Sequence, residues 1–162
     1  MAAVHDAVLR CLALQEPLVV HSQVGSDRKS IISTMAASLR DWIGAETTVV
    51  IRYVGSSPAC LDVAYILSTV CAQIAAAFDI YRDSSSSLAA SLADVNAFPT
   101  LRLFFVETLN AVAPLLVEKR RLVIILDGLD QLLPMDDAYS LDWYVSGRVV
   151  CLLLLLMLFC CY

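Results

Sequence analysis

The apolar residues of this chain recur with two different periods, and the alternation of these periods predicts alternating strands and helices. Apolar runs rich in β-branched residues predict buried strands at Leu18–His21, at Thr47–Tyr53 and over residues 122–127. Apolar residues spaced three or four positions apart predict helices over 2–15, from about 29, over 59–80 and from 99, with shorter ones at 88–94 and near 136–142. Pro114 is expected to kink or loosen the helix that begins at 99. The order predicts an α/β fold in which right-handed crossovers join parallel strands, preceded by one N-terminal helix.

The end of the chain breaks this pattern. Residues 149–162 are a run of 14 uncharged and almost wholly apolar residues. The run is shorter than the ~20 residues of a membrane-spanning helix. A continuous apolar run is typical of a central strand of a parallel sheet, but periodicity alone does not separate a strand from a buried helix. We therefore expect a buried strand or a helix packed on the core. The alternative is a membrane-associating or aggregation-prone tail.

Composition and charge narrow the class of protein. The 162 residues suggest one domain, and 59% apolar against 17% charged residues supply ample material for a core. The net charge is −5 and no basic patch is visible, so we expect no nucleic-acid binding. Six cysteines without a Cys-x-x-Cys pair, and only two histidines, give no zinc-ligand pattern. We interpret most of the cysteines as reduced core thiols of an intracellular, cytoplasmic protein.

The first candidate for chemistry is the acidic end of the third strand. The apolar run that starts at residue 122 leads directly into Asp127, Gly128 and Asp130. In open α/β sheets, ligands bind outside the carboxyl ends of the strands. Asp127 would therefore lie where a metal-bound phosphate sits in a nucleotide-binding protein. The alternative is a buried strand followed by a solvated acidic turn.

The second candidate is the loop after the first strand, residues 22–30, which reads SQVGSDRKS. Strand, glycine-containing loop, Lys-Ser and helix form the context of a phosphate-binding P-loop. Backbone N–H groups at the helix start cradle phosphate oxygens, the lysine adds a charge and the hydroxyl binds Mg²⁺. However, Gly25 is the only glycine of the loop, and Arg28 stands where the motif has glycine before Lys29. Asp27 also brings a negative charge, and the alternative is an ordinary strand-to-helix turn.

Taken together, four stretches resemble the NACHT-type P-loop NTPases of the STAND class, and most of all those of NACHT and WD-repeat proteins and their nephrocystin-like relatives. The stretches are PLVVHSQVGSDRKS (17–30), VVIRYVGSSP (49–58), ILSTVCAQI (66–74) and RLVIILDGLDQL (121–132), extended by SLDW (140–143). The resemblance covers roughly residues 15–143 and implies a partial P-loop NTPase fold, a three-layer α/β/α sandwich. It divides the chain into an N-terminal helix (1–16), a truncated NACHT-like domain (17–143) and an apolar tail (144–162). The family's later sensor, winged-helix and repeat regions have no counterpart here, so a truncated copy is expected.

The resemblance also implies roles for single residues. Lys29, with the loop around Gly25, would contact the phosphates of the nucleotide, and Ser30 would bind Mg²⁺. Asp127 would hold Mg²⁺ through water, and Asp130 would be the catalytic acidic group near the attacking water. Gln131 stands where the family often has glutamate, which weakens a catalytic interpretation. In this class of sheet, the strand that follows the Asp127 strand inserts beside the P-loop strand, and residues 149–159 could fill that position.

Three functions follow as hypotheses. The first is a regulatory module that binds ATP or GTP with Mg²⁺ within a larger protein assembly and is weak or defective in hydrolysis. The second is a non-enzymatic interaction scaffold that has lost the nucleotide. The third, a membrane-associated fragment, rests only on residues 149–162.

Overall fold

The computed structural model describes residues 2–14, 17–21, 28–80, 98–116, 120–136, 138 and 152–158, the last seven as backbone only. Four α-helices lie in these ranges: α1 (Ala2–Leu14), α2 (Arg28–Ile43), α3 (Val63–Phe78) and α5 (Phe98–Val112). The strands are β1 (Leu18–His21), β2 (Thr47–Tyr53), β3 (Arg121–Asp127) and β4 (Leu152–Leu158). Three short 3₁₀ turns complete the set: η1 (Pro58–Leu61), η2 (Ala113–Leu115) and η3 (Leu129–Gln131).

The four strands form one parallel sheet with the order β1-β4-β3-β2. The parallel sheet predicted from the sequence is therefore confirmed. The strand β4 comes from the apolar run at the end of the chain and pairs with β1 on one side and with β3 on the other. Of the interpretations of that run, the inserted strand is the one that is confirmed. No helix in the described part of the chain has both the length and the apolar character that crossing a membrane requires.

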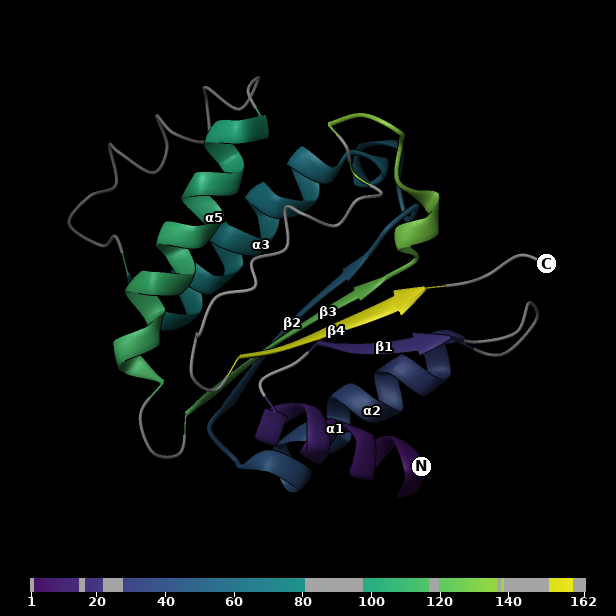
Figure 1. Ribbon diagram of the computed structural model, residues 1–162, viewed down its shortest axis with the longest axis vertical. Helices are drawn as coiled ribbons and strands as arrows, with labels where there is room; N and C mark the ends of the chain where they lie inside the picture. Colours follow the sequence, from purple (N-terminus) through teal and green to yellow (C-terminus); the bar gives the residue numbers. More distant parts are fainter. Residues whose placement is uncertain are drawn as a thin grey trace.

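Helices cover both faces of the sheet, which gives three layers (Figure 1). α1 and α2 lie on one face, and α3 and α5 lie on the other. The two hydrophobic clusters follow this division, because alternate residues of β3 point to opposite faces. Leu122, Ile124 and Leu126 belong to the cluster under α3 and α5, whereas Val123 and Ile125 belong to the cluster under α1 and α2. The predicted α/β sandwich with an N-terminal helix is confirmed.

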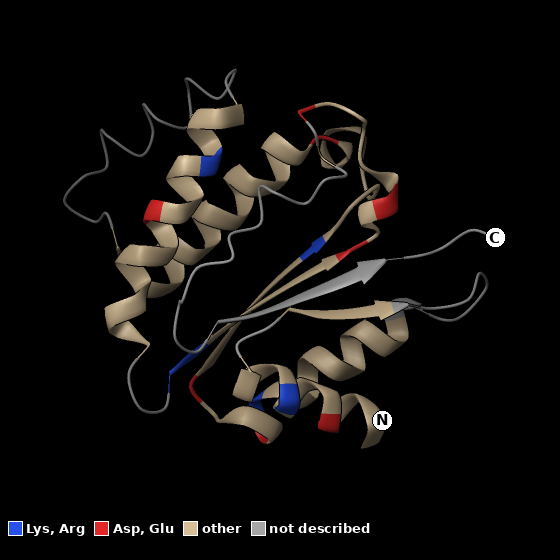
Figure 2. Cartoon of the chain, viewed as in Figure 1, with Lys and Arg blue, Asp and Glu red and all other residues tan. Residues whose placement is uncertain are grey.

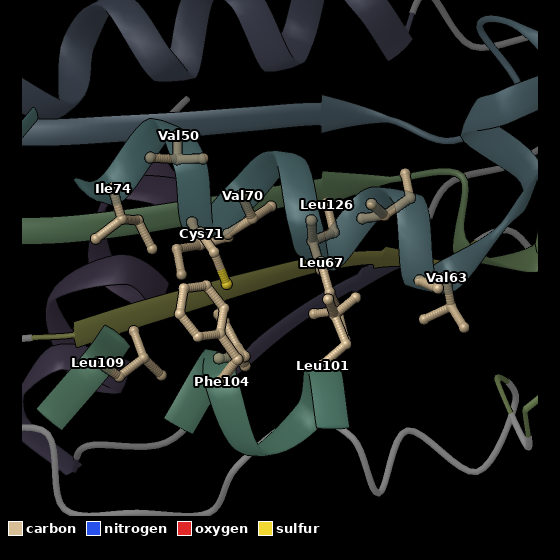
Figure 3. Close-up of a cluster of buried hydrophobic side chains, with 14 of the residues drawn as sticks. Val50, Val63, Leu67, Val70, Cys71, Ile74, Leu101, Phe104, Leu109 and Leu126 are labelled. Carbon is tan, nitrogen blue, oxygen red and sulfur yellow. The ribbon is translucent and has the colours of Figure 1, made fainter. Parts of the chain in front are cut away.

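The larger cluster joins α3 to α5 (Figure 3). Its side chains point toward one another from the two helices, with Leu67 and Cys71 on α3 facing Leu101 and Phe104 on α5. Leu67 and Leu101 are almost completely buried. The apolar residues whose spacing predicted the two helices therefore form the contact between them.

Two helix predictions need correction. The helix predicted over 59–80 is divided: η1 ends at Leu61, and α3 begins only at Val63. Asp62 separates the two, because its carboxylate accepts a hydrogen bond of 2.8 Å from the backbone N–H of Ala64 and so caps α3. The loosening that Pro114 was expected to cause near Asn110 lies slightly later, because α5 ends at Val112 and the 3₁₀ turn that contains Pro114 follows. The helix predicted over 88–94 lies outside the described residues, as does most of the one predicted near 136–142.

Candidate functional site

The candidate site begins with Asp127, the last residue of β3. Its side chain is only 7% exposed. Its backbone oxygen accepts a hydrogen bond of 2.8 Å from the N–H of Val54, which continues the pairing of β2 and β3 by one step. The sequence prediction that an acidic residue ends a buried strand is confirmed. The carboxylate therefore has a fixed position at the carboxyl edge of the sheet.

The register of the sheet brings the end of β1 to the same level. Asp127 is the partner of Met157 in β4, and Met157 is the partner of Val20 in β1. Because neighbouring strands are ~4.8 Å apart, the backbones at Asp127 and Val20 are about 10 Å apart. β1 ends one residue later, and α2 begins at Arg28. The connection between them therefore leaves the sheet at the edge where Asp127 lies.

The first turn of α2 contains two of the predicted site residues, Lys29 and Ser30. The first N–H groups of a helix have no partner within the helix and form the positive end of its dipole, which favours an anion. Ser30 is exposed at this position. Gly25 lies outside the described residues, and so does the side chain of Lys29. Their predicted contacts with phosphate stay predictions.

Asp130 lies on η3, directly after β3. Gly128 has φ +79°, which allows the chain to turn sharply after Asp127, and the N–H of Gln131 donates to the Gly128 oxygen at 2.9 Å. Asp130 is exposed, whereas Asp127 is buried. Figure 2 shows acidic positions at the end of β3 and on the segment that follows. The fold thus brings both predicted carboxylates to one edge, and the catalytic role of Asp130 stays a prediction.

Asp127 and Ser30 are the two predicted magnesium ligands, and this role stays a prediction. Among the described residues, no three His, Cys, Asp or Glu side chains are grouped so that they could hold a metal. Mg²⁺ usually takes one or two protein oxygens and keeps water and phosphate oxygens as its other ligands. The carboxylate of Asp127 and the hydroxyl of Ser30 are oxygen ligands of this kind.

One feature of this edge was not predicted from the sequence: the side chain of Gln131 lies against two glycines. A Cβ atom on Gly55 would overlap Oε1 of Gln131, and one on Gly128 would lie 3.0 Å from Nε2 of the same side chain. Gly55 also has a positive φ, +77°. The sequence does show Gly55 as part of a turn. The contact depends on the pairing of β2 with β3, which no local signal gives.

Among the described basic side chains near this edge, Arg52 has a structural role. Arg52 on β2 donates to the oxygen and hydroxyl of Thr69 and to the side-chain oxygen of Gln73, both on α3. Burial lowers the pKa of Arg52, although the neighbouring Cys60 and Tyr65 oppose this change. These bonds fasten α3 to β2 and do not point to phosphate binding.

Comparison with known proteins gives one informative match. The chain is 29% identical over 133 residues to NACHT and WD repeat domain-containing protein 2 of the mouse, Mus musculus. The match covers 78% of this chain and 7% of that protein's length. No protein-family model matches the chain, and no solved structure matches it. The similarity points to a relationship with NACHT-domain proteins, in agreement with the resemblance seen in the sequence.

Proposed function

We propose that this chain is a nucleotide-binding regulatory module of the NACHT type, which binds ATP or GTP with Mg²⁺ weakly and hydrolyses it slowly or not at all. The observation that carries the proposal is the position of Asp127. A buried carboxylate ends a central parallel strand, at the edge where β1 gives way to the first turn of α2. Ligands of open α/β sheets bind at this edge. The similarity to a NACHT and WD repeat protein supports the same class of function.

In this proposal, different residues bind the phosphates, the Mg²⁺ and the water molecule. The first N–H groups of α2, with Lys29, would hold the phosphate oxygens. Ser30 and Asp127 would hold Mg²⁺, which supplies positive charge against the phosphates when it is bound. Asp130, exposed on η3, would orient a water molecule. The loop has a single glycine and Arg28 in place of a second. Because backbone freedom lets a loop wrap closely around phosphate, we expect a dissociation constant in the micromolar range or weaker.

Isothermal titration with ATP and with GTP, each with Mg²⁺ and with EDTA, tests the proposal. We expect measurable binding that depends on Mg²⁺, and a loss of roughly tenfold or more for Asp127→Asn, since removing a charged ligand costs 1.4 kcal/mol or more. Ser30→Ala should weaken the Mg²⁺-dependent part, and Lys29→Ala should weaken both parts. Asp136→Asn and Ser38→Ala are matched controls. Asp136 is exposed beyond η3, and Ser38 donates to Thr34 within α2.

The second candidate function is an interaction scaffold that has kept the fold and lost the nucleotide. Arg28 in place of a loop glycine favours it. The same titration separates the two: no heat at millimolar nucleotide, with or without Mg²⁺, would rule out the regulatory nucleotide-binding module and leave the scaffold. Turnover that Asp130→Ala abolishes would instead show that the site is an active NTPase.

A further inference from the structure

The side chain of Gln131 occupies a slot that exists only because two residues lack a Cβ atom. Gly55 follows β2, and Gly128 follows β3. An alanine methyl group at Gly55 would collide with the Gln131 amide, and one at Gly128 would press against both the amide and the backbone oxygen of Val54, at 3.2 Å. Both glycines also have positive φ. An exposed side chain of η3 therefore lies against the turns that follow two neighbouring strands.

Two backbone hydrogen bonds join the same two segments on either side of this slot. The N–H of Val54 donates to the oxygen of Asp127 at 2.8 Å. The N–H of Leu133 donates to the oxygen of Leu61, also at 2.8 Å. In the sequence, Gln131 lies between Asp127 and Leu133, the two residues that make these bonds to the segment that follows β2. It lies on the surface where the segment after β2 (residues 54–62) meets the segment after β3 (residues 128–133), against Gly55 and Gly128.

We infer that Gln131 is a positioning residue of the proposed nucleotide site: by filling the slot between Gly55 and Gly128, it fixes the carboxylates of Asp127 and Asp130 relative to the segment after β2. The inference rests on the proposed function. η3 is a single turn that contains Asp130 and is closed by the hydrogen bond from the Gln131 N–H to the Gly128 oxygen. A contact that restrains the Gln131 side chain therefore also restrains the position of Asp130. The segment after β2 also contains Asp62, which caps α3. The bond from the Leu133 N–H to the Leu61 oxygen, directly before Asp62, joins the segment after β3 to the start of α3.

A double-mutant cycle on thermal stability tests the contact without any nucleotide. Gly55→Ala should lower Tm by roughly 4–8 °C, because it strains the backbone and expels the amide. Gln131→Ala alone should lower Tm by no more than about 3 °C. In the double variant, Gln131→Ala should restore at least half of the Gly55→Ala loss, because the remaining Cβ of residue 131 lies at an ordinary contact distance, 3.6 Å.

Gly44→Ala is the matched control. Gly44 also has a positive φ, +127°, but lies at the opposite end of β2. Gln131→Ala should not rescue it. Losses for Gly55→Ala and Gln131→Ala that simply add, or equal rescue of Gly44→Ala, would overturn the inference.

Nucleotide titration then tests whether the contact positions the site. Gln131→Ala should weaken Mg²⁺-dependent binding about fivefold to tenfold and leave binding in EDTA unchanged, because it displaces the carboxylates and not the phosphate loop. Gln131→Met, which fills the same space without an amide, should restore most of the affinity. A purely structural role would change Tm without changing the Mg²⁺ dependence, and that result would overturn the positioning role. A wild type that binds no nucleotide would contradict the proposed function instead, and the cycle would still decide the contact.

Discussion

The helices on the two faces of the sheet differ in how many of their described side chains are buried. On one face, α3 buries nine residues and α5 buries six, and they share a single cluster with β3. On the other face, Val8 is the only buried residue of α1, and the described side chains of α2 add Ile32, Met35 and Leu39. Most other apolar residues of that second cluster are only partly buried. Free energy of burial follows the area removed from water, so among the described side chains the face of α3 and α5 contributes more to stability than the other face.

The difference matters because the residues of the candidate site come from two differently packed parts of the molecule. Asp127 ends β3, which is buried on both faces. Lys29 and Ser30 lie on α2, which belongs to the lightly packed face. The part of the proposed site that Asp127 supplies therefore has a firmer support than the part that Lys29 and Ser30 supply.

The sharpest test uses the same substitution on both faces. Leu67 on α3 and Leu39 on α2 are both fully buried. Leu67→Ala should lower the free energy of unfolding by about 3–4 kcal/mol, and Leu39→Ala by about 2–3 kcal/mol, because the thinner layer can close part of the cavity. Urea denaturation followed by circular dichroism measures both values. Equal losses, or a larger loss for Leu39→Ala, would contradict the comparison.

The deeper face also contains a titratable group. Burial raises the pKa of the Cys71 thiol to about 12, although a hydrogen bond with the Thr108 side chain opposes this change. The folded state therefore holds the proton more tightly than the unfolded state, and this stabilisation is complete below the unfolded pKa, near 9. Above pH 9 the wild type should lose up to about 1.4 kcal/mol per pH unit relative to Cys71→Ala. Parallel pH profiles for the two proteins would show that Cys71 is not buried as described.

The start of α3 offers a smaller test of the same face. Asp62→Ala removes the carboxylate that accepts from the N–H of Ala64 and should cost about 1 kcal/mol. Asp62→Asn keeps a capping oxygen and should lose only a few tenths of that. Thermal and urea denaturation of the pair measure the difference. If both variants lost the same amount, the cap would not be what begins α3 at Val63.

The smallest effect is expected on α1. The ring of His5 packs edge-on against Trp42 of α2, with centroids 5.3 Å apart, and His5 is at the border of exposure. His5→Ala should cost about 0.5–1 kcal/mol, as is usual for one aromatic contact near the surface. Arg10→Ala, an exposed change on the same helix, is the control. A loss above 2 kcal/mol for His5→Ala in urea denaturation would show that α1 is held as firmly as α3.

The fold was largely predictable because its signals are local. The apolar runs of β1 and β2 give their observed limits, and β3 begins one residue earlier than predicted. The division at Asp62 was missed because an apolar stripe runs through it, while a single side-chain hydrogen bond decides where the helix begins. The apolar run at the end of the chain was ambiguous for another reason. Strand and buried helix share such a pattern, and only the position between β1 and β3 decides for the strand.

The position of Asp127 at the end of a buried strand was predictable from the sequence, whereas the packing around that edge was not. Asp127 was found because a carboxylate directly follows a buried apolar run. The contact of Gln131 with Gly55 joins residues far apart in sequence, and it depends on the register of β2 against β3. Sequence patterns describe one segment at a time, so a contact that two segments create together has no signal in either.

The central position of β4 has a consequence for folding. Among the described strands, β1 comes first in the sequence and pairs with β4, which comes last. This part of the sheet therefore forms only when the two strands that lie farthest apart in the sequence pair with each other. The entropy lost in closing so long a loop comes before the contact can stabilise the fold, and this order slows folding. During synthesis, α3 and α5 can pack against β2 and β3 before β4 has been made. Until then, β1 cannot pair with β4 and so is not joined to β3. We therefore expect an intermediate in which the α3 and α5 face is formed and the groove for β4 is open, and whose exposed strand edges make it the species most prone to aggregate.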